Sequence, residues 1–498
     1  MNIKQAKEYI KDTVTLYLKK DEFGEYSIPV VRQRPVFLLG APGIGKTAIM
    51  EQIAGELGIA LVAYSMTHHT RQSALGLPYI VKKTYDGNEV PITEYTMSEI
   101  IASVYETMEN SGMREGILFL DEINCVSETL APSMLQFLQY KTFGRHKVPE
   151  GWIIVTAGNP PEYNKSVREF DVVTMDRLKV LEVEADYDAW KIYAGEVGMH
   201  GSVLGFLELH KDYFYHIETT VQGRLYVTAR GWEDLSKILY MYEEEHLTVS
   251  EELIGQYIRS EQIVKEFGAY YDLYQKYKKD YRVDEILRGE APEETVEKAK
   301  LAPFDERLSL LGLLIDSVMA DIKEIMEQAK ELQELMPPLR ACKNGGKAME
   351  TLDVQIDARQ QLIARMDAGG TLTPAEKRKH KRILHFMEKA KKEMVTLGKT
   401  SHEEAAAHLE SCFNEETVRL KERTKKEQDV LTHLFDFASA AFKNGNEMLI
   451  LVTELTVNTY AAQFIATFGS DAYKEHSEKM LLGERQDDLM EKIKELKL

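Results

Sequence analysis

A lysine and a threonine follow three glycines in the segment LLGAPGIGKTAIM at positions 38–50. The segment matches Gly-x-x-x-x-Gly-Lys-Thr, after an apolar run and before a helical pattern. Glycines let the backbone approach phosphate oxygens, and amides at a helix start point at the anion. We therefore predict a phosphate loop, in which Lys46 reaches the outer phosphates and the Thr47 hydroxyl binds Mg²⁺. The loop residues are Gly40, Ala41, Pro42, Gly43, Ile44, Gly45, Lys46, Thr47 and Ala48.

Two carboxylates follow a second apolar run, in the segment GILFLDEIN at positions 116–124. Asp121 stands 75 residues after Lys46 (121 − 46 = 75), behind a stretch typical of a buried strand. Because open parallel sheets place ligands at the carboxyl ends of strands, we expect this pair near the phosphate loop. We predict that Asp121 binds Mg²⁺ through water and that Glu122 polarises the attacking water as a general base. Alone, the pair would be read as a charge cluster at a helix start.

A polar amide ends a third apolar run, WIIVTAGNP at positions 152–160. Asn159 could contact the γ-phosphate of a nucleotide or the attacking water. The dipeptide Asn-Pro is also typical of a simple turn, and this alternative stays open.

The elements that must position these residues are predicted from the hydrophobic pattern. Short apolar runs alternate with helical patterns up to about residue 184, which indicates an α/β domain with a parallel sheet. After residue 185 strand signals nearly vanish, and a charged stretch with two prolines separates two helical regions. The expected strands are 35–39, 59–65, 117–120, 152–157 and 179–184. The expected divisions are an N-terminal helical segment 1–34, an α/β core 35–184, a helical segment 185–290, a linker 291–306 and an all-α C-terminal domain 307–498.

The C-terminal region opens with a long apolar seam. Apolar residues recur at steps of three and four from Leu308 to Leu332, so we expect this helix to pack along another helix or a partner chain. We expect it to end at Pro337-Pro338. A basic run at 377–382 could bind a polyanion, but we favour a solvated helix face, because most such charge runs are of that kind.

Composition limits the partners and the compartment. Lys and Arg number 62 against 81 Asp and Glu, giving a net charge of −19, which opposes binding to nucleic acid. Three scattered cysteines, Cys125, Cys342 and Cys412, favour free thiols in a reducing compartment. The apolar stretch 448–468 carries polar residues and indicates a buried helix, with no insertion into a membrane. We expect a cytoplasmic protein.

The three motifs, in this order, resemble those of the AAA+ ATPase superfamily, and their details resemble its MoxR-like branch, related to magnesium-chelatase and dynein-type modules. The resemblance covers about residues 30–240 and implies a P-loop NTPase sheet followed by a helical lid. It assigns Asn159 as sensor 1. The segment VTMDRL makes Arg177 the arginine finger, acting in trans, and TARGWEDL makes Arg230 the sensor-2 residue.

The sequence departs from the family pattern at several points. Cys125 stands where the family usually has a basic residue, and Arg168 in SVREFD is a rival for the finger. His68 and His69 could suggest a metal site. Adjacent side chains of an extended chain point to opposite sides, so we expect these histidines to make loop contacts instead.

The resemblance also implies an activity and partners. It implies hydrolysis of ATP with Mg²⁺ in a hexameric ring, a chaperone-like remodelling role, and a partner with a von Willebrand factor A domain. The C-terminal helices resemble extensions that such ATPases carry. Two alternatives remain from the residues: a nucleotide-gated scaffold with little turnover, and an AAA+ motor on nucleic acid, which the net charge opposes.

Overall fold

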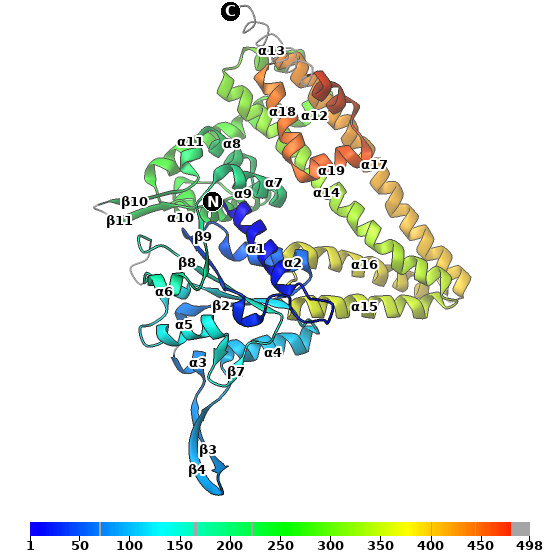
Figure 1. Cartoon of the computed structure of the whole chain (residues 1–498). Helices are drawn as coiled ribbons and strands as arrows, with labels where there is room; N and C mark the ends of the chain where they lie inside the picture. Colours follow the sequence, from blue (N-terminus) through cyan, green and yellow to red (C-terminus); the bar gives the residue numbers. More distant parts are fainter. Residues whose placement is uncertain (69–70, 164–166, 221–222, 400, 444, 480–498) are drawn as a thin grey trace, which may run out of the picture. The chain divides into compact units, whose positions relative to one another are not determined.

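The computed structural model describes residues 1–68, 71–163, 167–220, 223–399, 401–443 and 445–479. It divides into two compact units, drawn together in Figure 1. The first unit comprises Met1–Ala189 and Val354–Leu384, and the second comprises Trp190–Asp353 and His385–Leu498.

A five-stranded parallel sheet forms the centre of the first unit, with the strand order β2-β5-β8-β1-β9. The sheet strands are β1 (Val36–Gly40), β2 (Ala60–Ser65), β5 (Gly116–Asp121), β8 (Trp152–Gly158) and β9 (Lys179–Val183). All five expected strands are confirmed to within two residues. Their near-continuous apolar runs reflect burial on both faces, as parallel sheets require.

Helices, single turns and hairpins surround this sheet. They are α1 (Ile3–Leu18), η1 (Val30–Arg32), α2 (Lys46–Leu57), η2 (Met66–His68), α3 (Arg71–Leu75), β3 (Pro78–Tyr85), β4 (Asn88–Tyr95), α4 (Glu99–Ser111), η3 (Ile123–Cys125), α5 (Ala131–Tyr140), β6 (Thr142–Phe143), β7 (His146–Lys147) and α6 (Val172–Met175). The hairpin β3–β4 extends away from the rest of this unit in Figure 1. The core holds fully buried side chains of strands and helices, among them Leu118, Phe137 and Trp152.

The N-terminal helix α1 packs on α2 and β9. Its buried face includes Ala6, Ile10 and Val14, and Asn2 forms a capping box with Gln5 at its start. The backbone of Met1 also pairs with β9, because Met1 N donates to the carbonyl of Glu182 at 3.0 Å. Segment 1–34 is therefore part of the α/β unit.

Part of the C-terminal region belongs to the first unit as well. Residues 354–384 span the end of α15 (Ala348–Ala368) and the start of α16 (Pro374–Thr396). At the turn between them the carbonyl of Gly369 accepts a hydrogen bond of 2.8 Å from Leu61 N, on the edge strand β2. This contact covers backbone groups that an open sheet edge would leave unpaired.

The second unit is mainly helical. Its elements are α7 (Tyr187–Val197), which crosses the boundary, α8 (Gly201–Leu209), η4 (Lys211–Tyr213), β10 (His216–Thr220), β11 (Gly223–Val227), α9 (Ala229–Glu244), α10 (Glu251–Tyr257), α11 (Glu261–Asp280), α12 (Val283–Leu287), α13 (Glu293–Leu301), α14 (Phe304–Asn344), α17 (His402–Phe442), α18 (Asn446–Val457) and α19 (Thr459–Phe468). The hairpin β10–β11 lies in a region where the sequence indicated almost no strands. The two longest helices, α14 and α17, pack along each other, and the apolar seam of α14 is largely buried.

The structure differs from the sequence prediction in the arrangement of the C-terminal half. Segment 185–290 and most of 307–498 form one unit, and the stretch expected as a linker carries α13, whose Thr295 and Ala299 are buried. The expected end of a helix at Pro337-Pro338 is wrong, because α14 continues through both prolines to Asn344. Each proline removes one backbone donor, but packing of the next turn, where Cys342 is fully buried, holds the helix beyond them.

No single helix in the described part of the chain is long and apolar enough to cross a membrane. Together, α18 and α19 reach that length and composition, but they are bent by 85° at Asn458. The sequence had indicated one buried helix here. Five residues of α18 are buried, including Leu451 and Leu455, and both helices pack on α14.

Candidate functional site

The glycine loop after β1 has the backbone that the sequence motif requires. Gly43 and Gly45 have φ angles of 76° and 94°, which residues with a side chain rarely adopt. Gly45 directly precedes the first turn of α2. A Cβ atom on Gly40 would lie 2.6 Å from the carbonyl oxygen of Val183, on the neighbouring strand β9. The amides of the loop and of the α2 N-terminus are thus arranged to receive an anion.

The side chain of Lys46 connects this loop to the end of β8, the strand beside β1 in the sheet. Its side chain is 8% exposed, and Nζ donates to the carbonyls of Gly40 and Ala41 at 2.6 and 2.8 Å. It also donates to Asn159 Oδ1 at 2.9 Å. This contact follows from the sheet, since β1 pairs with β8 and Leu39 lies opposite Gly158.

Thr47 and Asp121 meet at the carboxyl end of the sheet. Thr47 Oγ1 donates to Asp121 Oδ2 at 3.1 Å. A hydroxyl and a carboxylate are hard oxygen ligands of the kind that Mg²⁺ prefers, with the remaining positions taken by phosphate and water. The donor set therefore fits the predicted magnesium site, with Thr47 and Asp121 as its protein groups.

Glu122 has a rare backbone conformation, and its side chain is bound by Ser65, a residue that the sequence did not single out. Its φ is 55°, in the left-handed region, and its N–H donates to Asp121 Oδ1 at 2.9 Å. Its Oε2 accepts a hydrogen bond of 3.1 Å from Ser65 Oγ. Ser65 is the last residue of β2 and lies opposite Asp121 in the parallel ladder. Its position at the carboxyl end of an apolar run was the one feature of the sequence that could have indicated a place in the site.

Asn124 is a second residue that the sequence did not single out. Its Nδ2 donates to the backbone carbonyl of Asn159 at 2.8 Å, and its Oδ1 is buried with no hydrogen-bond partner among the described residues. A Cβ on Gly158 would lie 2.5 Å from Oδ1, so glycine is required there. Asn124 thereby ties the segment after β5 to the end of β8 and orients the Asn159 backbone.

The three arginines of interest lie in different settings. Arg168 forms an ion pair with Glu128, and its backbone N–H donates to Asn124 O at 2.9 Å. Arg177 is exposed on the turn between α6 and β9. Its charge contributes, after the hydrogen bonds from Thr174, to the lowered pKa of Asp171. Arg230 is exposed near the start of α9, in the second unit.

Cys125 and the histidine pair complete the predicted residues. Burial raises the pKa of the Cys125 thiol, and the carboxylates of Glu122 and Asp121 raise it further. The thiol thus stays protonated at neutral pH and carries no charge beside the two acids. His69 and the side chain of His68 lie outside the described residues.

Together, the parallel sheet, the glycine loop and the acidic pair at the end of β5 define a P-loop nucleoside-triphosphatase fold. Residues 35–178 match the family model of the AAA domain (dynein-related subfamily). The chain therefore carries an AAA+ domain, which confirms that part of the resemblance. No curated protein matches the chain.

Proposed function

We propose that the protein is an AAA+ ATPase of MoxR-like type that binds Mg²⁺ and ATP and hydrolyses ATP to ADP and phosphate. The observation that carries the proposal is the meeting of the phosphate loop with two strand ends. Lys46 contacts Asn159 at 2.9 Å, and Thr47 contacts Asp121 at 3.1 Å. A purely structural lysine would have no need of a glycine loop, an acidic pair and a polar amide at one edge of a sheet.

Each residue has a distinct role in the proposed reaction. Lys46 exchanges its contacts with backbone carbonyls for the β- and γ-phosphates, and the loop amides hold the same oxygens. Glu122 accepts a proton from the attacking water, and Asn159 orients that water. Thr47 and Asp121 would hold Mg²⁺, which would supply positive charge to stabilise the phosphates in the transition state.

The first test compares Glu122→Gln with Glu51→Gln, a substitution of an exposed carboxylate on α2. We expect Glu122→Gln to bind ATP with near-parental affinity and to release phosphate at least 10²-fold more slowly, as about 10²–10⁴-fold is typical of a lost general base. The Glu51→Gln protein should match the parent in both measurements. Equal turnover of the parent and Glu122→Gln would refute the catalytic assignment.

We propose further that Arg177 acts on the nucleotide of a neighbouring subunit in a hexameric ring, and that Arg230 senses the nucleotide from the helical lid. The exposure of Arg177 supports the first assignment, whereas Arg168 is already paired with Glu128. Mixing an Arg177→Ala protein with a Glu122→Gln protein tests it. Activity should return in the mixture, because some sites then combine one intact finger with one intact base. Activity of Arg177→Ala alone would transfer the role to Arg168.

The biological role that we propose is remodelling of a protein partner in the cytoplasm, with a von Willebrand factor A domain protein as the partner. The hairpin β3–β4 supports a protein contact, because Ile80 is 77% exposed and Tyr85 is 52% exposed. The test is stimulation of ATP turnover by such a protein.

A nucleotide-gated scaffold is favoured instead if ATP turnover stays negligible with every partner. The hydrogen bond from Ser65 Oγ to Glu122 Oε2 would then keep the carboxylate from activating water. A motor on nucleic acid would require salt-dependent DNA binding, which the net charge of −19 opposes.

A further inference from the structure

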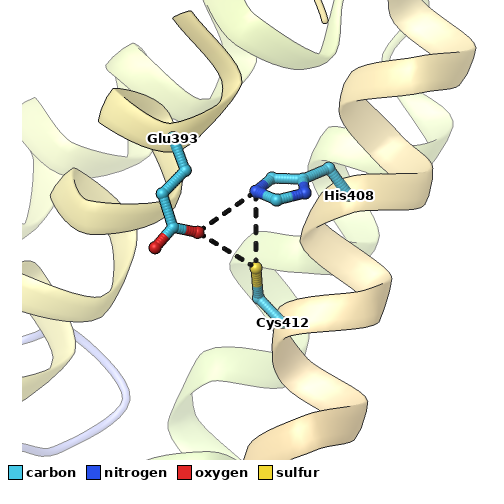
Figure 2. Close-up of side chains that lie close together, drawn as sticks. All are labelled: Glu393, His408 and Cys412. Carbon is cyan, nitrogen blue, oxygen red and sulfur yellow. Dashed lines mark hydrogen bonds and ion pairs between the residues drawn. The ribbon is translucent and has the colours of Figure 1, made fainter. Parts of the chain in front are cut away.

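Three side chains of different chemistry converge between α16 and α17, within the second unit. They are Glu393 on α16 and His408 and Cys412 on α17, and Figure 2 shows their reactive atoms turned toward one another. His408 and Cys412 are four residues apart, so they share one face of the helix. None of the three takes part in the nucleotide site.

The distances between the three atoms match those around one tetrahedral zinc ion. His408 Nε2 lies 3.3 Å from Glu393 Oε2, and Cys412 Sγ lies 3.6 Å from His408 Nε2 and 3.8 Å from Glu393 Oε2. With usual zinc bond lengths, tetrahedral geometry places these pairs about 3.3, 3.6 and 3.5 Å apart. An ion could therefore occupy the centre with a shift of one side chain by a few tenths of an ångström.

Hydrogen bonding explains the arrangement less well. A charge-assisted bond from imidazole to carboxylate is usually about 2.7–2.9 Å long, and the observed 3.3 Å is longer. The Cys412 thiol is a weak hydrogen-bond donor, and its Sγ lies 3.8 Å from Glu393 Oε2. A triangle in which all three sides are loose and similar is expected when the atoms share a central ion.

Charge and burial also suit a divalent ion. A thiolate and a carboxylate cancel two positive charges, so the occupied site would be neutral. His408 is 11% exposed and Glu393 is 40% exposed, which leaves access from solvent. Three protein ligands leave the fourth tetrahedral position for water.

The positive charge of Lys399 contacts the site and opposes the binding of a cation there. Its Nζ lies 3.3 Å from His408 Nδ1 and donates to it, which keeps the imidazole proton on Nε2. Metal binding at Nε2 moves that proton to Nδ1 and ends the hydrogen bond from Lys399. Since Lys399 lies on the turn after α16, its long side chain can move toward solvent.

We propose that Glu393, His408 and Cys412 form a binding site for Zn²⁺ that joins the end of α16 to the start of α17. Binding releases the thiol proton of Cys412, and the ion replaces three loose contacts with three coordinate bonds. The proposal does not rest on the proposed ATPase activity, because none of the three ligands is assigned to the nucleotide site.

The test uses Co²⁺ as a spectroscopic probe on the intact, metal-stripped protein, with a non-thiol reductant and without nucleotide. We expect one equivalent to give the visible bands of tetrahedral cobalt and a thiolate-to-cobalt charge-transfer band. Cys412→Ser should remove the charge-transfer band, whereas Cys125→Ser should keep it. Glu393→Gln should weaken binding by at least tenfold, and Lys399→Met should strengthen it, because a competing positive charge is removed.

Circular dichroism of each variant checks that the helices are retained. Zinc alone should raise the thermal midpoint of the parent and of Cys125→Ser but leave that of Cys412→Ser unchanged. The proposal is overturned if the folded parent gives no charge-transfer band, or if the band survives in Cys412→Ser.

Discussion

The ammonium of Lys46 donates a hydrogen bond of 2.9 Å to the side-chain oxygen of Asn159. The two residues are 113 positions apart in the chain and meet because β1 and β8 are neighbours in the sheet. Asn159 is thus in direct contact with the phosphate loop, and the hydrogen bond from Lys46 fixes the orientation of its side-chain amide. The contact makes Asn159 part of the site before any nucleotide arrives.

Replacing Asn159 by alanine should slow ATP hydrolysis more than it weakens nucleotide binding. We expect kcat to fall about 10²-fold, which is typical when one preorganised polar group is lost at the reacting centre. Affinity for ATP should change little, because the loop amides and Lys46 remain. Phosphate release and nucleotide titration measure the two effects. The control is Asn88→Ala, at the exposed tip of the hairpin β3–β4.

An equal loss of affinity and turnover in Asn159→Ala would contradict a role in positioning water. It would indicate instead that Asn159 mainly holds Lys46. Full activity would remove Asn159 from the site.

Replacing Ser65 by alanine should change the behaviour of Glu122. The serine hydroxyl now donates to Glu122 Oε2 at 3.1 Å, which stabilises the charged carboxylate and restrains it. Without this bond the carboxylate is free to turn toward the attacking water and to accept its proton. We expect several-fold faster basal turnover in steady-state phosphate release, with an unchanged KM. Ser65→Thr keeps the hydroxyl and should behave as the parent, and a fall in kcat for Ser65→Ala would contradict this account.

Two glycines of the same region should respond oppositely to substitution by alanine. A methyl group on Gly40 would lie 2.6 Å from Val183 O and 2.9 Å from Ile44 Cδ1, whereas one on Gly55 meets nothing within 4 Å. We expect Gly40→Ala to destabilise the protein by about 1–3 kcal/mol and to weaken ATP binding. Gly55→Ala, in the last turn of α2, should stabilise it by about 0.5–1 kcal/mol. Denaturant unfolding measures both, and a harmless Gly40→Ala would show that β9 can move away from the loop.

The strands and the phosphate loop could be predicted because their signals are local. A buried parallel strand is an apolar run, and the loop motif fixes its own backbone. Ser65 and Asn124 could not be singled out in this way, since each acts only through a residue brought close by strand order. The zinc ligands were equally hidden, because Glu393 and His408 are 15 positions apart and meet only when two helices fold back on each other.

The C-terminal half shows where local rules fail. Two prolines predict the end of a helix, yet α14 continues past them because tertiary packing stabilises its last turns. The division into units could not be predicted either, since residues 354–384 pack with a sheet that ends 171 residues earlier in the chain (354 − 183 = 171). Such contacts depend on the packing of distant surfaces, which composition does not reveal.

A buried carboxyl in the second unit should make stability depend on pH. Glu427 on α17 is 4% exposed, and its Oε1 has no hydrogen-bond partner within the described ranges. Its pKa is raised from 4.5 to about 8, chiefly by burial and then by the charge of Asp321, against the opposing effects of Lys426 and Arg423. Between these two values the unfolded chain loses the proton while the folded chain keeps it. Stability from this group is therefore full below about pH 4.5 and is lost as the pH rises to about 8.

Glu427→Gln removes this titration while keeping the size of the side chain. We expect the thermal midpoint of the variant to exceed that of the parent at pH 8, and the difference to shrink steadily toward pH 5. Glu422→Gln, which removes an exposed carboxylate from the same helix, should leave the pH profile unchanged. If Glu427→Gln shows the parental dependence on pH, the carboxyl is charged in the folded protein. A partner for it would then have to be sought, with Arg423 as the first residue to replace.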